Sequence, residues 1–178
     1  MLEGILYQEF GTGSTYSLYR RRMFEDIRFP FGLYYEDLAV THKLHMLCRR
    51  AVITSEYMYG YRYNPDSIIQ NRWSPKMLDC IPVSRQLYSE VCAQIPELKS
   101  AAASRAFSSN RMVYLKIPYE LKEERGKVWA EMMKYRASVI SDPHARKRER
   151  IAALLTYLGE SLFHIIFSAA YRRWQKKI

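Results

Sequence analysis

Apolar side chains recur at helical spacing through most of this chain, interrupted by stretches that contain glycine or proline. The clearest early case is residues 36–50, where Val40, Leu44 and Cys48 fall on one side of a helix. From Trp73 onward the pattern continues with only short breaks. It predicts helices over residues 2–10, 16–25, 36–50, 74–93, 97–116, 119–139 and 143–177.

The period changes from helical to alternating in residues 51–64, AVITSEYMYGYRYN. Tyrosines occupy every second position from Tyr57 to Tyr63, which places four rings on one face of a strand. The turn NPDS, residues 64–67, ends the pattern. We therefore expect an α+β, helix-dominated fold, with a small sheet of two or three strands and a C-terminal helical bundle. An exposed edge of that sheet favours a homodimer.

Composition narrows the class of protein. The chain has 178 residues, of which 48% are hydrophobic and 14% aromatic, enough to build one core. A formal net charge of +10 favours anionic partners. Cys48, Cys80 and Cys92 contain no C-x-x-C pair, so we expect free thiols in a reducing, cytoplasmic compartment. We expect no signal peptide at residues 2–10 and no membrane-spanning run.

Two adjacent carboxylates, Glu36 and Asp37, follow an approach rich in aromatic residues that contains Pro30 and Gly32. A carboxylate in the first turn of a helix stays ionised near neutral pH, because the helix terminus favours negative charge. An ionised carboxylate at the mouth of a cleft suits a general base. Neighbouring positions on a helix point about a third of a turn apart. One carboxylate would therefore act as the base, and the other would cap the helix or orient a ligand. An ordinary acidic first turn is the alternative.

A second candidate site follows the alternating segment. Arg62, Asn64 and Ser67 surround a turn whose backbone amides could help to bind an anion. The alternative is a hydrophilic turn with Arg62 in solvent.

Taken together, these features resemble the acceptor-side half of family 2 glycosyltransferases of bacterial polysaccharide synthesis. The family pattern has a basic helix, an "irFp-G--yED" loop, a helix, two strands and an "lY-YR" end followed by a "-S-I" turn. Three blocks of this chain match it: Leu18, Tyr19, Arg20, Arg21 and Phe24; then Ile27, Arg28, Phe29, Pro30, Gly32, Tyr35, Glu36 and Asp37; then Tyr59, Tyr61, Arg62, Ser67 and Ile68.

The resemblance implies that Asp37 is the base of an inverting transfer, with Glu36 beside it as an acceptor or orienting ligand. It implies that Arg62 contacts the donor diphosphate, and Asn64 stands where the family often has His or Arg. The partners would be a nucleotide-sugar donor and a glycan or lipid-linked acceptor, and the full-length enzyme would use Mn²⁺ or Mg²⁺.

The resemblance also divides the chain. Residues 1–70 would be the C-terminal part of a GT-A catalytic domain, with a remnant of its sheet, and residues 71–178 a helical extension. No two aspartates have the family's D-x-D spacing, so we expect a fragment without the nucleotide-binding half, without a metal or cofactor of its own, and inactive alone.

Residues 144–178 carry an apolar stripe between two basic clusters. The stripe comprises Ile151, Leu154, Leu155, Leu158, Leu162, Ile165, Ile166 and Ala169. It could lie on an anionic bilayer, as a peripheral contact at the inner face of the membrane, or pack as a core helix.

Two further possibilities belong to other classes. A basic helical module that binds nucleic acid or a protein partner would explain the charge, although no aromatic-lined groove favours nucleic acid. A folded relic that acts only as a scaffold or dimer is the other. His42 and His45 lack a third ligand in register, so zinc is not expected.

Overall fold

The computed structural model describes residues 1–11, 13, 15, 17–60, 62, 64 and 73–175, with side chains described as far as residue 167. Within these residues the fold is all-α, since no strand occurs among them. The expectation of an α+β fold with a sheet remnant is therefore wrong for the part of the chain that the structure describes.

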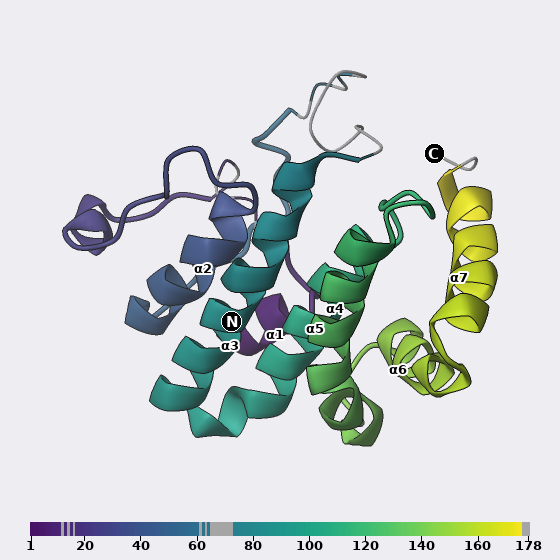
Figure 1. Ribbon diagram of the computed structural model, residues 1–178. Coiled ribbons are helices and arrows are strands. Elements are labelled where there is room, and N and C mark those ends of the chain that lie inside the picture. The colour runs from purple at the N-terminus through teal and green to yellow at the C-terminus, as the bar shows by residue number, and fades with distance from the viewer. Residues whose placement is uncertain are drawn as a thin grey trace.

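Three helices run side by side through the centre of the molecule (Figure 1). They are α3 (Cys80–Gln94), α4 (Lys99–Tyr114) and α5 (Lys122–Ser141). The middle helix α4 is packed on both sides, and its sequence explains how: Ala101, Ala102, Ala103 and Ala106 are all buried. Alanine favours the helix and lets neighbouring helices come close.

The remaining helices flank these three. α1 (Leu2–Leu6) and α2 (Glu36–Leu47) pack against α4 and α3 respectively, while α6 (Lys147–Leu155) and α7 (Glu160–Gln175) follow α5. Short 3₁₀ turns connect them: η2 (Arg21–Phe24), η3 (Pro75–Asp79), η4 (Pro96–Leu98) and η5 (Thr156–Leu158). One hydrophobic core extends from Leu2 to Phe163, so residues before and after position 70 share it.

The alternating segment forms no strand as far as Gly60. Residues 51–60 are all exposed and have no regular secondary structure. An alternation of β-branched and aromatic residues shows that a segment fits a pleated, half-buried surface, but a strand also requires a neighbour for its backbone amides and carbonyls. No strand lies alongside within the described residues. Residues 61, 63 and 65–72 lie outside the described part.

The single long helix expected over residues 143–177 is also wrong. Gly159 interrupts it with φ 88° and ψ 164°, a conformation that a helix cannot contain. The chain ends α6 in the 3₁₀ turn η5 and starts α7 in a new direction, along the edge of the molecule (Figure 1). Among the described residues, no helix has the length and apolar character to cross a bilayer.

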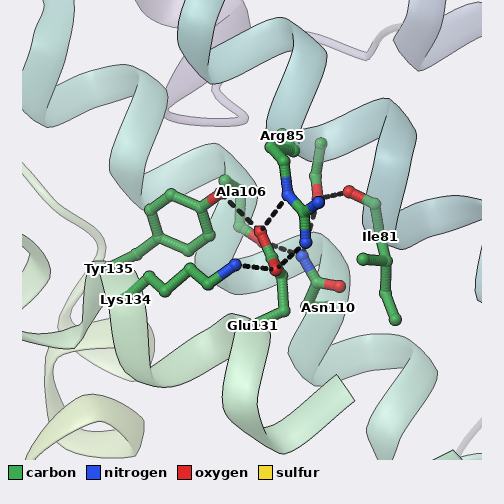
Figure 2. Close-up of polar contacts among 8 residues, drawn as sticks. Ile81, Arg85, Ala106, Asn110, Glu131, Lys134 and Tyr135 are labelled. Carbon is green, nitrogen blue, oxygen red and sulfur yellow. Dashed lines mark hydrogen bonds and ion pairs between the residues drawn. The ribbon is translucent and has the colours of Figure 1, made fainter. Parts of the chain in front are cut away.

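A buried carboxylate connects the central helices. Glu131 of α5 is 2% exposed and accepts hydrogen bonds from Arg85 of α3, from Lys134 and from the Tyr135 hydroxyl, at 2.7, 2.6 and 2.8 Å (Figure 2). Beside it, the amide of Asn110 donates to the carbonyl of Ala106 and to a serine hydroxyl of α3. Because a buried carboxylate is stable only when it is paired, this network fixes α5 against α3.

Candidate functional site

The approach to the two carboxylates is a constrained loop. Gly32 has φ 74° and Tyr35 has φ 64°, both in the left-handed region, which is costly for a tyrosine. The backbone amide of Tyr34 donates to Asp79 Oδ2 at 3.0 Å, and Lys76 lies 5.6 Å from the centre of the Tyr34 ring. Residues of η3, far along the sequence, therefore hold the loop in place.

Helix α2 begins directly after this loop, as the sequence predicts. Glu36 is exposed and Asp37 is half-buried. Asp37 Oδ1 accepts a hydrogen bond from the amide of Leu38 at 2.7 Å. The free amides of a helix N-terminus attract negative charge, so the two acids stand where a carboxylate is favoured. Asp37 partly faces the bundle, whereas Glu36 faces solvent.

Arg105 of α4 is a charged neighbour of this site that sequence reasoning missed. Burial lowers the pKa of its guanidinium, while the nearby charge of Asp37 acts in the opposite direction. The charges of Arg146 and Glu149 act on it as well. The only sequence signal was a single arginine in the alanine-rich stretch of α4, and nothing in its spacing indicates α2.

Tyr35 joins the approach loop to the same region. Burial raises the pKa of its hydroxyl, and the nearby carboxylates of Asp79 and Asp37 raise it further. Its hydroxyl therefore stays protonated near neutral pH and can donate a hydrogen bond.

Aromatic side chains connect the first two blocks of the glycosyltransferase pattern. The ring of Phe24, from the first block, lies 5.7 Å from Tyr19 and 6.1 Å from Phe29 of the second block. Tyr19 in turn lies 6.3 Å from His45 of α2. These edge and tilted contacts are the geometry that aromatic pairs prefer, and they place η2 against α2.

The same segment carries an open, cationic hollow. Its lining residues are Arg21, Arg22, Phe24, Glu25 and Arg28. Three arginines and one glutamate give this lining a net positive charge, which favours an anion such as a phosphate.

Of the third block, the structure describes Tyr59 and Arg62, and both are exposed, as is Asn64. Ser67 lies outside the described part of the chain. The assignment of Arg62, Asn64 and Ser67 to a diphosphate site thus stays a prediction, as do the catalytic assignments of Asp37 and Glu36.

A divalent metal does not fit the residues that are described. No three His, Cys, Asp or Glu side chains come together there as a metal site requires. His42 contacts Glu90 at 2.7 Å and the Leu38 carbonyl at 3.2 Å, and His45 lies beside Tyr19.

Comparison with known proteins adds no assignment: no protein-family model, curated protein or solved structure matches this chain.

Proposed function

We propose that this chain is the acceptor-side portion of an inverting glycosyltransferase, which moves a sugar from a nucleotide-sugar to a glycan or lipid-linked acceptor. The observation that carries the proposal is the sequence FPFGLYYED, whose two acids begin α2 immediately after left-handed Tyr35. Strained backbone at a non-glycine residue is more common at functional sites than elsewhere, since it persists only where surrounding contacts impose it.

In the proposed reaction, the Asp37 carboxylate accepts the proton of an acceptor hydroxyl while that oxygen attacks the anomeric carbon of the donor sugar. A new carbon–oxygen bond forms, the bond to the nucleoside diphosphate breaks, and its electron pair leaves with the diphosphate. No general acid is needed, because the leaving group departs as an anion. Glu36 would orient the acceptor, and Arg62 would meet the diphosphate.

Exposed apolar side chains in the first sixty residues support a partner surface on this half of the chain. Leu18, Phe31, Val52, Tyr57 and Met58 are each at least 70% exposed. Where exposed apolar side chains gather in one large patch, they mark a surface that another protein or a membrane covers. In a glycosyltransferase, the nucleotide-binding half would cover it.

The experiment that tests this proposal adds a nucleotide-binding half to the chain. The chain is co-expressed with the separate nucleotide-binding half of a family 2 glycosyltransferase, and transfer of labelled sugar is measured with Mn²⁺ added. We expect Asp37→Asn to lower the transfer rate by about 10² to 10⁴, the usual contribution of a general base, and the matched Glu36→Gln variant to lower it less. The chain alone should transfer nothing.

Equal activity of Asp37→Asn and wild type would contradict the proposal. So would failure of the chain to bind any member of a glycan array while it shifts random DNA or RNA in a salt-dependent manner. That result would favour the basic binding module, for which the net charge of +10 is the supporting observation.

A further inference from the structure

Exposed apolar side chains occur in each of α6, η5 and α7. We define the α6–α7 ridge as Ile151, Leu154, Leu158, Leu162, Ile165 and Ile166, whose exposed fractions lie between 42% and 63%. These residues belong to the stripe that the sequence marks as either core or membrane-facing. These six side chains lie outside the core, whereas Leu155 of the same stripe packs against it.

The buried faces of α6 and α7 show what holds these helices. α6 packs through Ala152 and Ala153, both fully buried. α7 packs through Phe163, whose ring lies 5.6 Å from Tyr114 and 5.3 Å from Trp129.

Polar contacts fix the start of α7 in the same orientation. Arg125 of α5 donates to Glu160 Oε1 at 3.2 Å and contacts His164 Nδ1 at 2.8 Å. The hydroxyl of Tyr114 also donates to Glu160 Oε1, at 3.1 Å. The ridge is therefore outside the core as a consequence of contacts on the opposite faces.

The charge around the ridge is positive. Residues 144–178 contain eight lysines and arginines and two acids, Glu149 and Glu160. Both acids are paired: Glu149 is completely buried against Arg111, and Glu160 contacts Arg125. Basic residues precede the ridge at Arg146, Lys147, Arg148 and Arg150, which are exposed, and follow it in the sequence at Arg172, Arg173, Lys176 and Lys177.

We propose that the α6–α7 ridge binds the surface of an anionic lipid bilayer, with the aliphatic side chains among the acyl chains and the exposed Arg146, Lys147, Arg148 and Arg150 on the headgroups. Aliphatic side chains between two basic clusters are the pattern of helices that lie in a membrane interface. Nucleic acid would bind the lysine and arginine side chains but would leave the aliphatic side chains in water. A second copy of the same segment would be repelled, because residues 144–178 contain eight basic residues and only two acids.

The experiment is vesicle flotation of the full chain with phosphatidylcholine vesicles, with and without phosphatidylglycerol. The test variant is Leu162→Glu/Ile165→Glu. The matched control is Leu47→Glu/Met112→Glu, which changes the net charge equally at two other exposed apolar residues. We expect wild type and control to float only with the anionic vesicles, and the test variant to bind about tenfold or more weakly.

Each other outcome overturns the proposal. Wild type that stays with the unbound fraction would show that the ridge does not bind lipid. Equal loss in both double variants would show that net charge alone drives binding. If the test variant instead shifts the oligomeric state in size-exclusion chromatography while flotation is unchanged, the ridge is a contact between protein chains. Circular dichroism of both variants checks that they are folded.

Discussion

Arg111 of α4 and Glu149 of α6 form a fork-shaped ion pair inside the bundle. Nε and Nη2 of the arginine donate to the two carboxylate oxygens at 2.7 and 2.8 Å, and the side chains are 6% and 0% exposed. This two-bond geometry is the strongest that arginine makes with a carboxylate. It connects the central helix to the segment that carries the α6–α7 ridge.

Breaking this pair from one side should destabilise the protein strongly. Glu149→Ala leaves a buried guanidinium without its main carboxylate, and we expect a loss of about 3–5 kcal/mol in the free energy of unfolding. The double variant Arg111→Met/Glu149→Leu should recover most of it, since no buried charge remains.

Urea denaturation followed by circular dichroism measures both variants of this pair. Lys127→Ala, which removes the exposed pair with Glu123, is the control and should change little. A Glu149→Ala midpoint equal to that of the control would contradict the prediction.

The Glu131 network predicts a loss of stability in acid. Burial by itself would raise the pKa of this carboxyl, but hydrogen bonds from Arg85, Lys134 and Tyr135 bring it below the ordinary value of 4.5. A carboxyl with a lowered folded-state pKa binds fewer protons in the folded state than in the unfolded state. Its contribution to stability is complete above pH 4.5 and is lost as pH falls through the folded-state pKa.

The corresponding measurement is the free energy of unfolding at several pH values between neutral and acid. Wild type should lose stability on acidification more steeply than Glu131→Gln, which has no carboxyl to protonate at this position. Parallel pH profiles for the two proteins would exclude the proposed role of Glu131.

Two glycines should respond in opposite directions to the same substitution. Gly159 needs φ 88° and ψ 164°, which only glycine adopts at low cost, so Gly159→Ala should destabilise by about 1–3 kcal/mol. Gly126 lies inside α5, and no atom lies within 4 Å of the position that a Cβ would take. Gly126→Ala should therefore stabilise by about 0.5–1 kcal/mol.

Melting temperatures of the two glycine variants show directly whether each substitution raises or lowers stability. If Gly159→Ala melted higher than wild type, α6 and α7 would be joined by something other than a glycine-dependent break. Because Gly126→Ala is the same chemical change in a helix, it controls for the general effect of alanine on the unfolded chain.

The sequence predicted the helices well where a single buried face decided them. α2, α3, α4 and α5 occur within a few residues of their expected ranges, since apolar periodicity reports burial against a neighbour. The prediction of a strand over residues 51–64 was wrong as far as Gly60. Alternation describes a preference for a sheet, but whether another strand lies beside it depends on residues elsewhere.

The C-terminal break shows a second limit of pattern reading. The stripe continues from Leu158 to Leu162 as if one helix passed through Gly159, and a lone glycine in a helical pattern usually costs only about 1 kcal/mol. The predicted stripe also does not include Phe163, which the structure buries against Tyr114 on the other side of the break. Similarly, the proximity of Arg105 to Asp37 depends on how α4 packs.

The hydrogen bond from the Tyr34 amide to Asp79 brings together the two ends of a long excursion of the chain. Within this excursion α2 packs against the bundle, whereas residues 51–60 are all exposed, and doubling the length of a flexible loop costs only about 0.6 kcal/mol of closure entropy. The exposed stretch around Glu56 is thus a suitable place for inserting a fluorescent reporter or an epitope without disturbing the helices on either side.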